Sequence, residues 1–305
     1  MRHSATLLGI LALVSGAWAQ TAPLPAETVP ASASETPATP APSASPAEDE
    51  ARPWPAPSPA PPVDPEKAAE QARISAVNEL FAAVFHGDAA RVRELIASGT
   101  NANHAMPVPV DPATAELFRP TVLDYFLSGE RGLTPLMVAA TLGHREVAEI
   151  LLQSGANPDA QTKRHGTNAL WLAGYTGKTD VTKLLLGVQP GSEADRMRIE
   201  IDLDGQTAQL FVDNVGEKAV PISSGRKGHP TPKGEFVVTN KHRHWRSTIY
   251  GASMPFYLRL SGRAFGLHAG QLPGYPASHG CIRLNKKDAQ DFFEHVPLGT
   301  IVVIK

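Results

Sequence analysis

Residues 132–144 read GLTPLMVAATLGH, and a Leu-Leu pair and the segment GANPD follow them at 151–152 and 155–159. The small alanines of this stretch allow helices to approach closely, its second glycine turns the chain, and the Leu-Leu pair can pack on a neighbouring unit. Leu136 recurs 34 residues later as Leu170, and the same pattern begins 56 residues earlier at Leu80. A recurring unit of this size predicts a stack of helical repeats.

The repeats resemble the ankyrin family through their Thr-Pro-Leu opening, their Gly-His turn and their Gly-Ala-Asn ending. The resemblance implies an all-α array of about three units over residues 67–192. Because the first two copies are 56 rather than 34 residues apart, we expect an insertion near 104–130. Insertions in such arrays project as loops, often on the binding face. This one either contacts a partner or is a loop that binds nothing.

The N-terminus predicts export. Residues 1–19 combine a short basic start, an apolar run and the small-x-small segment Ala17-Trp18-Ala19, which is typical of a cleaved signal peptide. The alternative is an uncleaved anchor. Half of the 28 prolines fall between Pro23 and Pro65, so residues 20–66 are expected to form a disordered linker. We expect a periplasmic or cell-envelope protein with no membrane span after cleavage.

From Met197 onward the apolar residues recur with a period of two, which predicts strands. Strands are expected near 197–203, 208–212, 218–223, 235–239, 256–261, 264–268 and 301–304. One convincing helix runs from Lys286 to His295 behind an Asn285 cap. The fold class is therefore multidomain, with the all-α repeat array followed by a mostly-β domain at 197–305. A net charge of −2 gives no support for nucleic-acid binding.

Cys281 is the only cysteine, so the chain cannot form an internal disulfide. It lies in SHGCIRL at 278–284, where His279 and Arg283 are cationic neighbours able to lower a thiol pKa. These surroundings favour a nucleophile over a buried structural cysteine. A zinc hydrolase is a weaker alternative, because the histidines follow no known metal spacing and have no glutamate base among them.

Five segments resemble, in order, the L,D-transpeptidase catalytic domain, also called the YkuD family. They are Ser223–Gly225, Thr231–Phe236, Met254–Phe256, Leu267–Gly270 and Ser278–Leu284. The resemblance implies that Cys281 attacks a peptidoglycan stem peptide and releases D-alanine, with a cross-link or an attached amine as product. It implies that His268 is the proton donor and acceptor, oriented by a backbone carbonyl such as that of Ala269. No cofactor and no metal are expected.

The residues around Cys281 have further expected roles, and for some of them two roles are possible. Ser278 is a candidate supporting donor, and Gly280 is expected to permit close backbone approach and, with Cys281, to supply oxyanion donors. His279 either holds the loop or touches substrate. Arg283 either binds a substrate carboxylate or pins the loop to an acidic partner. The basic run HRHWR at 242–246 has two possible roles. It either recognises the substrate or forms a solvated flap over the cleft.

Two functional alternatives stay open from the sequence. One is hydrolysis of the same substrate by an L,D-carboxypeptidase or endopeptidase, since the residues do not separate an amine from water as acceptor. The other is a non-catalytic ankyrin adaptor that binds the cell wall. A protein partner for the repeats is expected but not identified.

Overall fold

The computed structural model describes residues 64–125 and 131–305. The expected signal peptide at 1–19, and the linker up to residue 63, lie outside the described residues. Asp64 accepts a hydrogen bond from the Glu66 N–H and caps the first helix, α2, which begins at Pro65. Proline is well placed there, because the first turn of a helix leaves its N–H groups without intrahelical partners.

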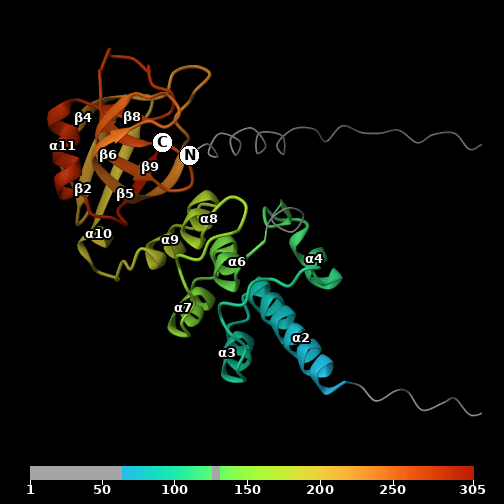
Figure 1. The fold of residues 1–305 in the computed structure, drawn as a ribbon. Coiled ribbons are helices and arrows are strands. Elements are labelled where there is room, and N and C mark those ends of the chain that lie inside the picture. The colour runs from blue at the N-terminus through green and yellow to red at the C-terminus, as the bar shows by residue number, and fades with distance from the viewer. Residues whose placement is uncertain (1–63, 126–130) are drawn as a thin grey trace, which may run out of the picture. The chain divides into compact units, whose positions relative to one another are not determined.

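Three helix pairs form the repeat array (Figure 1). They are α2 (Pro65–His86) with α3 (Ala89–Ala97), α6 (Pro135–Leu142) with α7 (Arg145–Gln153), and α8 (Ala169–Tyr175) with α9 (Thr179–Leu185). Gly87 and Gly143 end the first helix of the first two pairs in the left-handed conformation, at φ 70° and 84°. His144 Nε2 lies 3.0 Å from the Phe85 carbonyl oxygen and so links two successive units.

The insertion is more structured than a projecting loop. It contains helix α4 (Pro112–Phe118), whose N-terminus is capped by the Asp111 carboxylate at 3.0 Å from the Thr114 N. Phe118 and Leu123 are both fully buried, and the Phe118 ring stacks on Phe85 of α2 at 5.2 Å. The apolar residues of the insertion therefore extend the core of the array, a packing role that the proline-rich sequence did not reveal.

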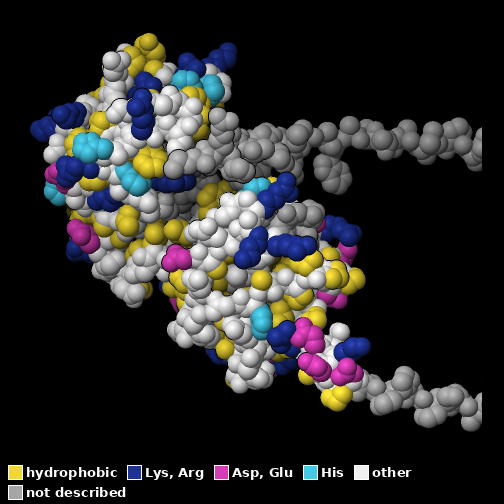
Figure 2. All heavy atoms as spheres, viewed as in Figure 1, with side chains coloured by type: hydrophobic (Ala, Val, Ile, Leu, Met, Phe, Trp, Pro, Cys, Tyr) yellow, Lys and Arg dark blue, Asp and Glu magenta, His cyan; other side chains and the backbone are white. Residues whose placement is uncertain are grey.

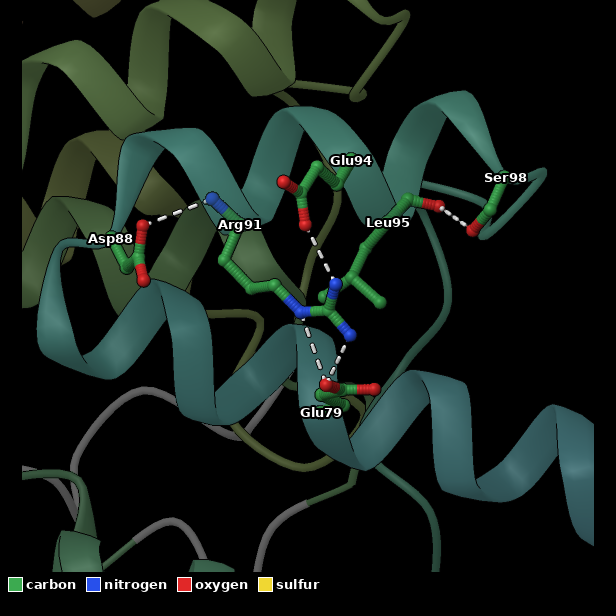
Figure 3. A network of polar contacts seen from close by, with 6 residues as sticks. All are labelled: Glu79, Asp88, Arg91, Glu94, Leu95 and Ser98. Atoms are coloured by element: carbon green, nitrogen blue, oxygen red, sulfur yellow. Dashed lines mark hydrogen bonds and ion pairs between the residues drawn. The ribbon is translucent and has the colours of Figure 1, made fainter.

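Arg91 ties the first two helices together at their surface (Figure 3). Its guanidinium contacts the carboxylate of Glu79 on α2 and, at 2.7 Å, that of Glu94 on its own helix α3. Asp88 caps α3 by accepting a hydrogen bond from the Arg91 N–H at 2.9 Å. Because these groups are well exposed to solvent, they orient the pair more than they stabilise it.

The C-terminal region is a closed sheet. A short helix, α10 (Glu193–Arg196), leads into nine strands: β1 (Met197–Asp202), β2 (Thr207–Val212), β3 (Val215–Gly216), β4 (Val220–Ser223), β5 (Gly234–Arg246), β6 (Ser253–Leu260), β7 (Gly266–Ala269), β8 (Ile282–Leu284) and β9 (Ile301–Ile304). Their order is β1-β9-β5-β6-β7-β8-β4-β2-β3, and β1 also pairs with β2, so the sheet closes on itself. Closure leaves few unpaired backbone groups at its edges.

Helix α11 (Lys286–His295) packs against β6, β7 and β8 (Figure 1). The Asn285 side chain caps it by accepting from the Asp288 N–H at 2.9 Å, as the sequence predicted. Phe292 of this helix joins the apolar core that Ile199, Leu258 and Ile282 share. Across the described part of the chain, no helix is both long and apolar enough to cross a membrane.

Leu80 lies on α2 with no solvent exposure in the core of the array. The Leu80→Ala variant should lower the free energy of unfolding by about 2–5 kcal/mol, because it leaves a cavity that the surrounding helices refill only in part. Urea denaturation followed by circular dichroism measures this. Arg73→Ala, at an exposed position of the same helix, is the matched control, and equal losses in both variants would contradict the assigned core.

Candidate active site

The two expected catalytic residues lie on neighbouring strands. His268 is the third residue of β7, and Cys281 directly precedes β8. The two strands are parallel, with Leu267 opposite Ile282 and His268 opposite Arg283. This register sets Cys281 beside the strand that carries His268, although twelve residues separate the two along the chain.

A backbone carbonyl orients the imidazole of His268. Its Nδ1 lies 2.8 Å from the carbonyl oxygen of Ala269. Because a carbonyl can only accept, Nδ1 must carry the proton, and Nε2 keeps a free lone pair. The expected contact with Ala269 is thereby confirmed, and the ring has the tautomer that a general base requires.

Buried hydroxyl groups hold the loop before Cys281. Ser278 Oγ donates to the Cys281 carbonyl oxygen and accepts from the Gly280 N–H at 3.0 Å. Thr231 Oγ1 donates to the Gly280 carbonyl oxygen at 3.0 Å and accepts from the Gly225 N–H at 2.8 Å. Ser278 therefore supports the loop as expected, and Thr231 is a second support that the sequence reading did not single out.

The conformation of Gly280 is one that side chains disfavour. Its φ is 113°, within the range where glycine is strongly preferred. We expected Gly280 and Cys281 to supply two oxyanion donors. The Gly280 N–H is instead committed to Ser278, whereas the Cys281 N–H has no hydrogen-bond partner among the described residues. The loop thus offers one free donor at this point, not two.

Burial keeps both reacting groups neutral. It raises the pKa of the Cys281 thiol above its usual value, against the opposing effects of a hydrogen bond from the Gly266 backbone and the charge of Arg283. Burial also lowers the pKa of His268, which is only 7% exposed, and the charge of Arg283 lowers it further while the Ala269 hydrogen bond opposes the shift. These shifts favour a thiol and a neutral imidazole as the resting forms of the pair, so any reaction of the thiolate would require ionisation first or in the same step.

Exposed side chains from three loops meet around His279. An Arg226 guanidinium nitrogen lies 2.7 Å from His279 Nε2, which must accept because the guanidinium can only donate. The rings of His229 and Tyr250 lie 4.8 and 4.5 Å from that of His279. Partial desolvation, and then the charges of Arg226 and His229, lower the pKa of His279. Figure 2 shows histidine and basic side chains exposed over the strand-bearing part of the chain.

Arg283 has no ion-pair partner among the described residues, so the acidic partner considered from the sequence is not found. Its aliphatic stem covers Gly270, where an added Cβ would lie 3.0 Å from Arg283 Cδ. The guanidinium is left available for an external anion.

The basic run at 242–246 is the end of strand β5, which is longer than the five residues expected from the sequence. His242 stacks on Trp245 at 4.5 Å, and Trp245 stacks on Tyr257 of β6 at 6.1 Å. The run therefore forms part of the hairpin of strands β5 and β6. Among the described residues, no group of three or more histidine, cysteine and acidic side chains is arranged to hold a metal ion.

Comparison with known proteins matches both regions. Residues 196–304 fit the model of the L,D-transpeptidase catalytic domain, and residues 78–198 fit that of ankyrin repeats in three copies. The chain carries an L,D-transpeptidase domain behind ankyrin repeats. Both resemblances in the sequence are thereby confirmed.

The relatives cover parts of this chain. Proteins named as the L,D-transpeptidase YkuD in Bacillus licheniformis and Bacillus subtilis are each 34% identical, over 110 and 109 residues. The match spans 35% of this chain and 64% of the length of each relative. A crystal structure of an L,D-transpeptidase from Mycobacterium tuberculosis matches with 27% identity and a TM-score of 0.34, over 36% of this chain and 57% of that one.

The neutral resting pair predicts slow alkylation of Cys281. In the folded protein, the rate with iodoacetamide should keep rising through and beyond pH 8.5, about the ordinary thiol pKa, because the raised pKa leaves little thiolate at neutral pH. Mass spectrometry follows the single modification, and the urea-unfolded protein is the control. A plateau at lower pH in the folded protein than in the unfolded one would show a preformed thiolate and refute this assignment.

Proposed function

We propose that the protein is a peptidoglycan L,D-transpeptidase that works through a cysteine thioester. The observation that carries this proposal is the β7–β8 pairing, which sets Cys281 beside the strand of His268 while Ala269 orients the imidazole. Within a domain of this family, a lone thiol next to an oriented neutral base is suited to acyl transfer.

The reaction proceeds in two halves. His268 Nε2 accepts the thiol proton as Cys281 Sγ adds to the carbonyl carbon of the third stem residue. The tetrahedral intermediate then collapses, the C–N bond breaks, and D-alanine leaves with the proton from His268. In the second half, an acceptor amine attacks the thioester carbonyl, the C–S bond breaks, and His268 takes a proton from the amine and returns it to the Cys281 sulfur. Water as acceptor would give the carboxypeptidase outcome instead.

The cationic groups near Cys281 suit this substrate. A stem tetrapeptide carries several carboxylates, including that of its terminal D-alanine. Arg283, without an acidic partner among the described residues, and Arg226, on the rim with His279, can bind such groups. Arg283 is assigned here to substrate binding, which is the reading that its missing ion pair favours.

We also propose that this activity takes place in the cell envelope. The signal-peptide pattern at 1–19 supports export, and the ankyrin repeats support docking to a protein partner that would direct the enzyme. Cell-wall biogenesis and maintenance of cell shape follow as the proposed biological role. A non-catalytic adaptor is disfavoured because the chain has both Cys281 and His268, which a binding remnant need not retain.

The Cys281→Ala variant should release D-alanine from a purified tetrapeptide muropeptide at least about 10³-fold more slowly than the wild type, because no other group can form the thioester. Free D-alanine is measured by a coupled oxidase assay. Circular dichroism confirms that the variant is folded. Persistent release by the variant would defeat the assignment, and mass spectrometry of wild-type products separates cross-linking from trimming.

The acid limb of the kcat/KM profile should lie below pH 6.5, the ordinary imidazole pKa. His268 is inactive as a base when protonated, and its lowered pKa keeps it neutral to lower pH. Arg283→Gln should move this limb to higher pH, since removing the charge raises the pKa of His268. Lys286→Gln, an exposed cation on α11, is the charge-matched control. A wild-type limb above pH 6.5 would contradict His268 as the titrating group, because burial, the largest cause of its shift, lowers its pKa.

A further inference from the structure

Tyr257 stands opposite His268 across two antiparallel strands. Strand β6 pairs with β7 so that Leu258 faces Leu267 and Arg259 faces Gly266. The same register, continued by one residue, sets Tyr257 against His268. Their ring centroids are 6.5 Å apart at an interplanar angle of 60°. Directly opposed residues of a ladder point to the same side of the sheet, so the phenol lies on the side of the sheet that carries the imidazole.

The backbone of β6 is strained just before Tyr257. Phe256 has a φ of 56°, which is rare for an aromatic residue. Its ring is fixed in the core against Phe293 of α11 at 5.8 Å. Tyr257 lies on the other side and is nevertheless only 3% exposed, covered by Trp245 and His268. Strain of this kind persists where the surroundings enforce it, and it clusters at functional sites.

Gly266 brings the tyrosine close to the nucleophile. An added Cβ at Gly266 would lie 2.8 Å from Tyr257 Cε2, so the ring edge packs directly against this glycine. The parallel register that pairs Leu267 with Ile282, continued by one residue, sets the same glycine level with Cys281, and its backbone lowers the pKa of the thiol. One residue therefore lies beside both the phenol ring and Cys281.

The hydroxyl of Tyr257 has no hydrogen-bond partner among the described residues. Burial and then the charge of Cys281 raise its pKa, so the phenol stays protonated and remains a donor. The Tyr257 side chain is mostly buried, but its hydroxyl oxygen is not fully enclosed, so this donor without a protein acceptor is available to a bound substrate.

We propose that Tyr257 Oη donates a hydrogen bond to the oxyanion that forms when Cys281 attacks an acyl carbonyl. It would complete an oxyanion site in which the Cys281 N–H is one donor and the Gly280 N–H is already occupied by Ser278. The inference deepens the proposed function. It rests on that function only because it requires Cys281 to perform acyl transfer.

The electron and proton balance leaves Tyr257 unchanged. The Sγ–C bond forms as the carbonyl π pair moves onto oxygen, and His268 Nε2 takes the thiol proton. Collapse of the intermediate restores the carbonyl and expels the leaving group. Throughout, the phenol keeps its proton and only donates a hydrogen bond, whose strength grows as the oxygen becomes an anion.

The test compares two reactions of the same sulfur in Tyr257→Phe, which keeps the ring packing. Acetylation of Cys281 by p-nitrophenyl acetate passes through an oxyanion, whereas alkylation by iodoacetamide does not. Removing an oxyanion donor should slow acetylation, and D-alanine release, by about 10²-fold, with a fall in kcat rather than a rise in KM. The alkylation rate should stay within about twofold of the wild type. Tyr175→Phe, in α8 of the ankyrin region, is the matched control.

The outcomes separate this inference from the proposed function. Acetylation within about twofold of the wild type would overturn the role of Tyr257, and so would a parallel loss in alkylation, which would mean that the phenol acts through the thiol. If the wild type releases no D-alanine but the contrast between acetylation and alkylation holds, the peptidoglycan assignment fails and the oxyanion role stands. Thermal melting of Tyr257→Phe checks that the fold is retained.

Discussion

The parallel pairing of β7 with β8 is the constraint on which the site depends. Only three residues of each strand take part, yet this pairing sets Cys281 next to the strand of His268. Parallel neighbours cannot be joined by a tight turn, so the chain must leave β7 and return through a connection. Here the connection carries the Ser278–Gly280 loop, in which a hydrogen bond from Thr231 and one to Ser278 fix Gly280, the residue before Cys281. Displacing either strand would separate base from thiol.

The supports of this loop explain why so many small polar residues surround a reactive centre. Ser223, Ser224, Thr231 and Ser278 are all buried. A buried hydroxyl costs free energy unless it is paired, and each of these four takes part in a hydrogen bond. Their bonds run mostly to backbone groups of neighbouring loops. The network therefore holds backbone positions rather than side chains, which is what an exposed loop needs in order to present a fixed nucleophile.

The sequence predicted those parts of the molecule whose signals are local. The Asn285 cap and the ankyrin helices depend on neighbours within a few residues, whereas the contact of His268 with Ala269 was expected only from the family resemblance. Strand β8 was missed because three residues carry too little periodicity to recognise. Helix α4 was missed because its stability comes from Phe118 packing on Phe85, a tertiary contact. Tyr257 gave no signal of its own, since only the register of β6 and β7 sets it against His268.

In the proposed reaction, the electrostatics of the site would favour the transition state over the resting state. The charge of Arg283 would stabilise a thiolate but would oppose an imidazolium, so it cannot by itself stabilise a permanent ion pair between Cys281 and His268. Burial disfavours both ions and therefore decides that the resting pair is neutral. In the proposed reaction, negative charge would appear only as the sulfur attacks and would move onto the carbonyl oxygen, where the Cys281 N–H and nearby Arg283 would act on it in a partly dry site. Interactions that strengthen during reaction lower the barrier, whereas those that are equally strong before it do not. A neutral, buried thiol is thus consistent with catalysis, because the groups around it act on the charge that develops rather than on one already present.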